Sequence, residues 1–268
     1  MNTITLSVPL QFSHTIPFPS EWDELTTEEL LFICAEQLYE GKLIQFQKAA
    51  IFDFIFRNRA KDIKELKDNP STYLDPEDAA LAAIDLLDFL YKSNNLTRQH
   101  FPLIDISGTN FIGPEDNFDS ITCGEFEDTE IFYQDFITDP RPEPMARLTA
   151  ILWRQKGQDY MYFNAEKHKW LTYNHEPFTA AFSKLPESQL YAIFAWYSGC
   201  RSLLQGWFPY LYESGINSDE PDMLVFTKCI HAGAGEKNGS REDIRRMLLK
   251  EFFLDMNISA QNNKKLVS

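Results

Sequence analysis

Basic residues are scarce in this sequence. Its 268 residues include 25 Lys and Arg against 40 Asp and Glu, which gives a formal net charge of −15 with His neutral. Nucleic-acid binding through a broad positive field needs clustered Lys and Arg, so this charge argues against it. It also disfavours electrostatic docking on an anionic membrane. Hydrophobic residues still make up 44% of the chain, which is enough for a sizeable core and argues against a disordered protein.

Long hydrophobic runs and secretory features are also missing. Residues 1–18 have neither a basic start nor an unbroken apolar segment, so they do not predict a secretory signal. The most apolar run, residues 190–196, is far shorter than the roughly 18 residues of a membrane span. The four cysteines form no CxxC pair, and we expect them to be reduced core thiols in a cytosolic protein. The sequence therefore predicts no membrane partner.

Motifs for catalysis, metals and cofactors are lacking as well. His168 and His175 are seven residues apart, which fits no zinc-binding spacing. Residues 105–116 resemble a calcium loop but have Asn110 where a turn needs Gly and Asp116 where a Glu is usual. Residues 233–239 are glycine-rich but have no GK[ST] ending. We predict no catalytic residue, no metal and no cofactor, and an enzyme is the weakest hypothesis.

The acidity that is present is concentrated in two segments. Residues 1–41 contain seven acidic residues and no Lys or Arg. Residues 105–143 contain eleven acidic residues and Arg141 as the one basic residue. The remainder of the chain is slightly positive, so the charge indicates a polarised surface suited to a protein partner.

Local patterns predict a mainly helical protein. Capping boxes at Thr26–Glu29 and Thr122–Glu125 each precede an apolar helical pattern. Alternating apolar residues predict a strand over residues 4–10. We expect a mainly α fold, a multi-helix bundle with a minor β element made of the N-terminal strand and a short hairpin. The expected helices begin near residues 26, 44, 75, 122, 144, 178, 186, 220 and 241; residues 159–173 form the hairpin or flap; and residues 96–118 form a loop region, in which a short strand at 103–106 is left open.

Three regions are expected along the chain. Residues 1–100 form an N-terminal helical region with a leading strand, and residues 101–256 form an acidic and aromatic helical region. Residues 257–268 form a polar tail.

Two groups of residues are candidates for binding a protein partner. The acidic helix over residues 123–138 is either an ordinary solvated face, a surface for a basic partner, or a mimic of nucleic-acid phosphate. An aromatic group near the end of the long helix is either core or, where exposed, a set of interface anchors. The predicted partner-binding residues are Glu125, Glu127, Asp128, Glu130, Trp196, Trp207, Phe208 and Tyr210.

Two short motifs carry a resemblance to a known family. Residues 122–130 read T-x-G-E-F-x-D-x-E, and residues 148–154 read L-x-A-I-L-W-R. Both are similar to motifs in tail and virion-assembly proteins of tailed bacteriophages and prophages, over about residues 119–205. The sequence departs from the family at Gln155, where a Pro usually follows the Arg. The resemblance implies a non-enzymatic assembly factor, such as a chaperone that binds the tape-measure protein or another virion component.

Alternatives to a tail assembly chaperone remain open at this stage. One is a permanent connector or adaptor of the virion, and another is an acidic inhibitor that mimics DNA and binds a host protein. The resemblance implies a location in the cytoplasm of the bacterial host, or alternatively in the virion. The sequence leaves the oligomeric state open.

Overall fold

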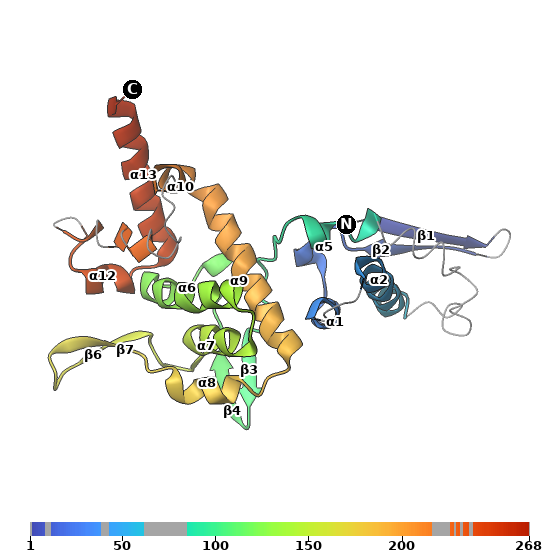
Figure 1. Cartoon of the computed structure of the whole chain (residues 1–268), viewed down its shortest axis with the longest axis horizontal. Helices are drawn as coiled ribbons and strands as arrows, with labels where there is room; N and C mark the ends of the chain where they lie inside the picture. The colour runs from blue at the N-terminus through green and yellow to red at the C-terminus, as the bar shows by residue number, and fades with distance from the viewer. Residues whose placement is uncertain are drawn as a thin grey trace. The chain divides into compact units, whose positions relative to one another are not determined.

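The computed structural model describes residues 2–8, 12–38, 43–61, 85–215, 226–227, 229–230, 233–235 and 238–267. The chain divides into two compact units, which are drawn in Figure 1. Unit 1 comprises Met1–Leu96 and Glu187–Gly199, and unit 2 comprises Thr97–Pro186 and Cys200–Ser268. Helix α9 (Glu187–Trp207) therefore contributes its first part to unit 1 and its last part to unit 2.

Unit 1 packs a pair of helices beside a two-stranded sheet. Strands β1 (Asn2–Val8) and β2 (Phe12–Phe18) are antiparallel, and α1 (Thr27–Leu38) is followed by α2 (Ile44–Ala60). The rings of Phe18 and Phe52, both buried, lie 5.2 Å apart and join the sheet to α2. Two short helices, η1 (Trp22–Glu24) and α5 (Phe89–Lys92), complete the described part of this unit with the start of α9.

The capping box predicted at the start of α1 is confirmed. The Glu29 carboxylate accepts a hydrogen bond from the Thr26 backbone N–H at 2.9 Å, and the Glu29 N–H donates to the Thr26 hydroxyl at 3.2 Å. Arg59 of α2 donates two hydrogen bonds of 2.8 Å to the same buried carboxylate. Glu29 therefore both caps α1 and ties it to α2.

Unit 2 contains a small antiparallel sheet in the order β3-β4-β5. Its strands are β3 (Leu103–Ile106), β4 (Thr109–Ile112) and β5 (Arg154–Gln155). Ser107 and Gly108, the two residues between β3 and β4, have φ values of 54° and 84°. Two successive positive φ values produce the tight turn that matches the twist of a hairpin. The buried Trp153 indole donates to the Phe101 carbonyl at 2.8 Å and holds the β5 end to the segment before β3.

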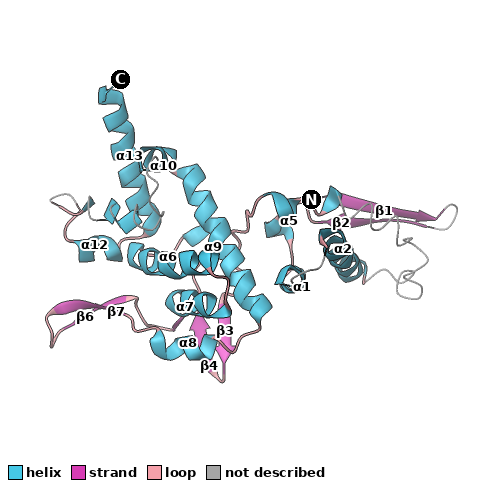
Figure 2. Cartoon of the chain, viewed as in Figure 1, coloured by secondary structure: helices cyan, strands magenta, loops and turns pink. Residues whose placement is uncertain are grey.

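Helices form most of unit 2 (Figure 2). α6 (Cys123–Thr138) packs against α7 (Pro142–Leu152), and α7 packs against α8 (Glu176–Phe182). α10 (Pro209–Gly215) packs against α13 (Leu249–Val267). The unit also includes η3 (Asp116–Phe118), α12 (Arg241–Arg246), and the hairpin of β6 (Met161–Asn164) and β7 (Lys169–Thr172).

A backbone bridge joins the start of α6 to the junction of α12 and α13. The Cys123 N–H donates to the Met247 carbonyl at 3.0 Å, and the Leu249 N–H donates to the Ile121 carbonyl at 2.8 Å. These bonds bring the last part of the chain beside residues more than a hundred positions earlier. They also place the α12 arginines beside the acidic face of α6.

The predicted multi-helix bundle is wrong, although the described part of the chain is mainly helical. That part has ten α-helices together with seven strands in three small sheets. The N-terminal strand has a partner, β2, and residues 103–112 with 154–155 form a further sheet. Alternation predicted the N-terminal strand, but β3, β4 and β5 are only two to four residues long, too short for alternation to distinguish them from loop.

Other predicted elements differ in detail or lie outside the described residues. The last helix, expected over residues 241–256, is two helices, and α13 continues to Val267 through the segment expected to be a polar tail. In α6, Thr129 is buried and Ile131 is exposed, so the apolar position of that turn is the threonine. The helices predicted to begin at residues 75 and 220 fall largely outside the described residues. The three-region division of the chain stays a prediction.

Within the described residues, no helix is both long and apolar enough to cross a lipid bilayer.

Candidate functional site

The carboxylates of α6 are positioned by the cap at its start. The Glu125 N–H donates to the Thr122 hydroxyl at 3.3 Å, and the Glu125 carboxylate accepts from the Thr122 N–H at 2.8 Å. This capping box, predicted from the sequence, is confirmed. It fixes the first turn and therefore sets which way the next three acidic side chains project.

Arginines from three other elements, β5, α9 and α12, hold these carboxylates. We call the set the α6 carboxylate network, and it consists of Glu125, Glu127, Asp128 and Glu130 with Arg154, Arg201, Arg241 and Arg245. Arg154 at β5 pairs with Glu125. Arg201 of α9 donates to Glu130 at 3.0 Å.

Helix α12 supplies the other two cations of the network. Arg241 donates to Glu127 at 2.9 Å, and Arg245 bonds both Glu127 and Asp128, the latter at 2.7 Å. The network thus connects α6 to β5, α9 and α12, all within unit 2.

Burial determines what the network can do. Glu125 and Glu130 are each 2% exposed, and Glu127 is also buried. The sequence-based expectation that these three carboxylates form an exposed acidic surface is therefore wrong. A buried carboxylate is tolerated when it is paired and hydrogen-bonded, and here every one has an arginine. Asp128 is partly exposed, but Arg245 and Tyr160 engage it.

Tyr160 shows how strongly this environment acts on a titratable group. Burial raises the pKa of Tyr160, and the nearby Asp128 charge raises it further. The phenol therefore stays protonated and donates its hydrogen bond to Asp128. Burial opposes the charge of Arg245, but hydrogen bonding to Asp128 and the charges of Asp128 and Glu127 raise the pKa of Arg245.

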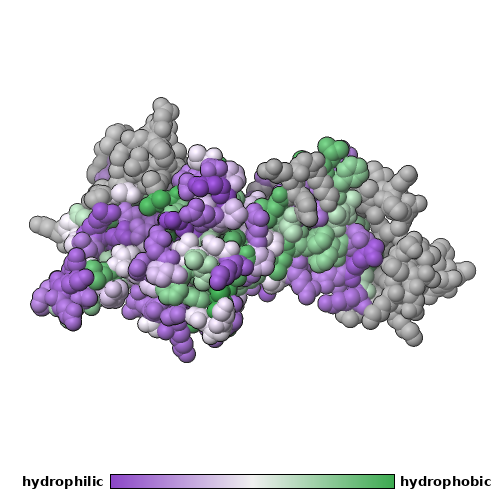
Figure 3. Space-filling view, turned by 60° about the horizontal axis from the view of Figure 1, so that its bottom comes forward, coloured by the Kyte–Doolittle hydropathy of each residue, from purple (hydrophilic) through white to green (hydrophobic). Residues whose placement is uncertain are grey.

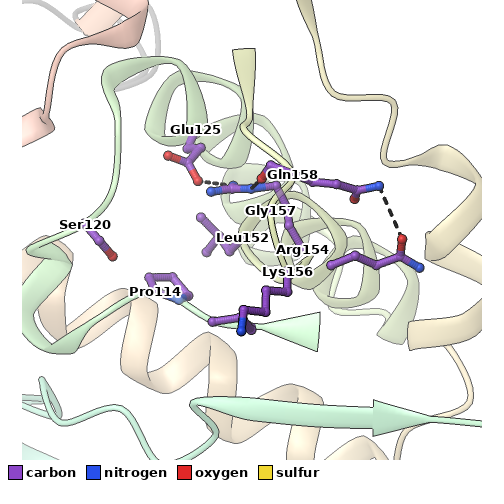
Figure 4. Close-up of a pocket in the computed structure, with 11 residues that line it drawn as sticks. Pro114, Ser120, Glu125, Leu152, Arg154, Lys156, Gly157 and Gln158 are labelled. Atoms are coloured by element: carbon purple, nitrogen blue, oxygen red, sulfur yellow. Dashed lines mark hydrogen bonds and ion pairs between the residues drawn. The ribbon is translucent and has the colours of Figure 1, made fainter. Parts of the chain in front are cut away.

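Two pockets flank the Arg154–Glu125 pair. The smaller, of about 190 Å³, extends toward Pro114, Lys156 and Gln158. Figure 4 shows Arg154 reaching across from the strand segment to Glu125 of α6. The larger, of about 360 Å³, extends toward Trp170 and α12. Both share Ser120, Glu125 and Arg154 as lining residues.

Several polar groups in these pockets already have partners within the chain. The Ser120 hydroxyl accepts from the Glu115 N–H at 2.9 Å, and the Thr122 hydroxyl caps α6. Arg245 is held by Asp128, and Arg246 pairs with Asp243. The arrangement is that of a neutralised structural network rather than of groups poised for proton transfer or nucleophilic attack. Among the described residues, no group of three or more His, Cys, Asp or Glu could hold a metal ion.

The four predicted aromatic anchors do not form one cluster. Trp196 is buried in unit 1. Phe208 is buried in unit 2, where its ring lies 5.5 Å from that of Phe253. Tyr210 is half-buried, with the Lys264 ammonium 5.7 Å from its ring. Trp207 is 43% exposed and has the Lys250 ammonium 4.2 Å above its ring.

Sequence reasoning missed two exposed features of unit 2. One is the outer face of α13, where Leu254 and Ile258 are exposed one turn apart. The other is the β6–β7 hairpin, where Tyr162 and Phe163 are exposed. The i, i+4 spacing of Leu254 and Ile258 resembles that of core residues, so pattern alone could not distinguish a surface position from a buried one.

The sequence matches no protein-family model, and comparisons with curated proteins and with solved structures likewise found no match.

Proposed function

We propose that this chain is a non-enzymatic bacteriophage or prophage assembly protein that acts through protein–protein contact, in particular as a tail assembly chaperone. The resemblance of residues 122–130 and 148–154 to tail and virion-assembly proteins motivates the proposal. The partner is a long helical virion protein such as the tape-measure protein. The site of action is the cytoplasm of the bacterial host.

The observation that carries this proposal is an exposed apolar strip on α13. We define the α13 strip as Trp207, Leu254 and Ile258, which are 43%, 52% and 46% exposed. Lys250 lies over the Trp207 ring, and Leu254 and Ile258 follow Lys250 at intervals of one helical turn. Leu254 and Ile258 are therefore about 6 Å apart along the axis of α13, at 1.5 Å per residue, and Trp207 of α9 extends the strip beside Lys250.

The opposite face of α13 is occupied inside unit 2. Leu249, Phe252 and Phe253 are buried there, and Phe253 contacts the rings of Phe208 and Tyr212. Because the inner face is already packed, Leu254 and Ile258 do not serve the core. Figure 3 shows much of the visible surface of unit 2 as hydrophilic, with hydrophobic residues in small separate areas. An apolar strip in such a setting is typical of a docking site.

The chemistry of the strip suits an apolar helix. A helix with apolar residues at i, i+3, i+4 and i+7 presents a ridge that packs against such a strip. A tape-measure helix waiting to assemble has this need, because its apolar side chains require cover until they reach their final partners.

The α6 carboxylate network supports this proposal over a DNA mimic. A mimic of nucleic-acid phosphate needs carboxylates that are exposed and free to meet a basic protein. Glu125, Glu127 and Glu130 are buried and bonded to arginines, so they are not available for that role. We therefore place partner binding on α13 rather than on α6.

Co-expression with the neighbouring long helical gene product, followed by size-exclusion chromatography, tests the proposal. The wild-type chain should co-elute with the partner and increase the soluble fraction of that partner. The double substitution Leu254→Glu and Ile258→Glu should abolish both effects, because it puts two charges on the strip. The matched control Ser259→Glu with Asn263→Glu adds the same charge at exposed positions of α13 outside the strip and should retain both.

Two outcomes would count against a chaperone. If no stable complex formed and the solubility of the partner did not increase, the proposal would be wrong. Detection of this chain in purified particles by mass spectrometry would instead identify a permanent virion component, since a chaperone leaves before the particle is complete.

A further inference from the structure

We call the face of the β6–β7 hairpin that carries Trp170 the anchored face and the opposite one the free face; both are partly exposed, and Phe163 on the anchored face is 51% exposed. Trp170 lies on the anchored face, where Arg246 of α12 is 3.8 Å from its ring centroid. Phe163 is the cross-strand neighbour of Trp170, and their rings are 5.5 Å apart. The hydrogen bond from the Tyr173 N–H to the Tyr160 carbonyl, at 2.6 Å, closes the base of the hairpin. These contacts fix the hairpin on unit 2, from which it extends outward in Figure 1.

The free face carries the opposite set of side chains. Successive residues of a strand point to opposite faces, so Tyr162, Leu171 and Lys169 share the face that turns away from Trp170. Tyr162 is 45% exposed, Lys169 is exposed, and Leu171 is half-buried. No residue of β6 or β7 is fully buried. A two-stranded hairpin is only marginally stable by itself, so covering its exposed aromatic and aliphatic face with a second surface would stabilise it.

The tip of the hairpin is basic. Lys167 and Lys169 lie beside Glu166, and all three are exposed. Neither lysine forms an ion pair among the described residues. In a chain whose formal net charge is −15, a projecting element with a positive tip is complementary to much of the chain's own surface.

A matching surface lies at the other end of α6. We define the acidic corner as Ile131, Asp135, Asp139 and Glu143. Arg141 is the shared cation of three of these residues, at 3.6 Å from Asp135, 2.7 Å from Asp139 and 3.6 Å from Glu143. Glu143 also pairs with Arg147 at 3.0 Å, so the surplus of negative charge lies on Asp135 and Asp139, which share Arg141. Ile131, which lies one turn before Asp135, is exposed and adds an apolar contact.

We propose that the free face and basic tip of the β6–β7 hairpin dock on the acidic corner of a second copy of this chain, so that the protein self-associates head to tail. Tyr162 and Leu171 would pack on Ile131, and Lys167 and Lys169 would pair with Asp135 and Asp139. Because the two surfaces differ, the interface is heterologous. In an open chain of copies, one end has an unoccupied hairpin and the other an unoccupied corner; in a closed ring every hairpin and corner is occupied.

Charge favours this occupant over nucleic acid or a lipid surface. Both of those carry negative charge that the acidic chain around the two lysines would repel, and they offer no apolar contact for Tyr162 and Leu171. A second copy has the same net charge of −15, so its docking relies on the local pairing of Lys167 and Lys169 with Asp135 and Asp139 and on the exposed Ile131. The inference rests on the proposed function in taking the chain to act by protein contact, but it uses different residues from the α13 strip.

Sedimentation velocity of the purified full-length chain tests the inference. The wild type should show a weight-average mass that rises with concentration. Raising the salt to about 1 M, where the Debye length is about 3 Å, should reverse the rise, because the exposed charge pairs are screened. Lys167→Glu with Lys169→Glu, and separately Asp135→Asn with Asp139→Asn, should each weaken self-association by about tenfold or more. Lys184→Glu reverses the charge of an exposed lysine after α8. This variant should have no effect on self-association and is the control for reversing a single lysine charge outside the hairpin.

Mixing the two double variants distinguishes docking from misfolding. The Asn variant keeps its hairpin and the Glu variant keeps its corner, so the mixture should form a heterodimer and nothing larger. A variant that had lost its fold could not restore binding in this way.

Three results would overturn the inference. One is a wild type that stays monomeric at every concentration. Another is self-association that the hairpin variants leave unchanged. The last is a monomeric wild type that binds a single-stranded oligonucleotide through Lys167 and Lys169, which would identify a nucleic-acid arm instead. The sedimentation measurement needs no virion protein, so it tests self-association even if the chaperone proposal fails. If self-association fails instead, co-elution with the tape-measure protein still tests the chaperone proposal.

Discussion

Arg201 of α9 donates hydrogen bonds from Nε to both carboxylate oxygens of Glu130, at 3.1 and 3.0 Å. Both side chains are largely buried, at 12% and 2% exposure. The guanidinium also lies 5.0 Å from the Tyr133 ring centroid, one helical turn beyond Glu130. The pair therefore locks the last part of α9 onto α6 inside unit 2.

Removal of one partner of this pair should be costly. Glu130→Ala removes the buried carboxylate that pairs with Arg201, and we expect unfolding in urea to require about 3–5 kcal/mol less free energy. Glu130→Ala with Arg201→Met should lose less than the sum of the two single changes, because the two side chains interact directly. Asp53→Ala is the comparison, since its pair with Arg57 is exposed and should change stability by less than about 1 kcal/mol. Equal losses at residues 53 and 130 would contradict the structural role of the network.

Glu29 should make the stability of unit 1 depend on pH in the acidic range. Burial alone would raise the pKa of Glu29, but hydrogen bonds from Arg59 and Thr26 outweigh burial and lower it below its ordinary value of 4.5. A lowered pKa means that the carboxylate stabilises the fold fully above its unfolded pKa. That stabilisation is lost as the pH falls through the folded pKa.

The measurement is urea unfolding of the wild type and Glu29→Gln at several pH values. The difference in unfolding free energy should be largest near neutrality and shrink as the pH falls below 4.5. Glu28→Gln, at an exposed neighbour, should show little difference at any pH. If the difference in unfolding free energy between the wild type and Glu29→Gln were the same at every pH, the ionised Glu29 carboxylate could not be the source of the pH dependence.

The two glycines near the end of α9 should respond oppositely to alanine. A Cβ at Gly199 would lie 2.2 Å from the backbone carbonyl oxygen of Leu96, while a Cβ at Gly206 meets nothing within 4 Å. Backbone cannot move aside as a flexible side chain can, so Gly199→Ala should destabilise by about 1–3 kcal/mol or more. Gly206→Ala should stabilise by up to about 1 kcal/mol through helix propensity. Thermal unfolding followed by circular dichroism would show the two midpoints moving in opposite directions, and a shared direction would refute the close approach at Leu96.

The cysteines should differ in reactivity toward a thiol reagent. Burial raises the pKa of both Cys34 and Cys123, and the Glu127 charge adds to the effect at Cys123. Burial raises the pKa of Cys229 as well, but Cys229 is only half-buried and is therefore more accessible to the reagent. Since the thiolate is the reactive form, DTNB should modify Cys229 first in the native protein and reach all four thiols only in denaturant. Cys34 modified as fast as Cys229 in the native state would contradict its burial.

Local signals in the sequence predicted local structure well. The capping boxes at Thr26–Glu29 and Thr122–Glu125 depend only on residues three positions apart, and both are present. The Ser240 cap with Asp243 is present for the same reason. Each of these motifs is complete within one turn of helix, so the sequence contains everything that the prediction needs.

Long-range pairing could not be predicted in the same way. The sequence shows that α6 is rich in carboxylates, but Arg154 and Arg201 lie 29 and 71 residues away from their partners. Nothing local distinguishes a carboxylate that will be buried against an arginine from one that will face solvent. Ser107–Gly108 is a different case, because a serine and glycine between two short apolar runs is a recognisable hairpin turn. The turn could therefore have decided the strand at residues 103–106, which the sequence-based prediction left undecided.

The order of the residues in the α6 network also bears on how the protein is made. Every arginine that pairs with the helix is synthesised after it, and Arg245 follows Glu127 by 118 residues. While the chain emerges from the ribosome, the helix has its carboxylates in place before any of their counterions exist. The carboxylates of α6 therefore stay solvated until β5, α9 and α12 have been made and pack against the helix. The segment that carries α12, rather than the motif-bearing middle, completes the network.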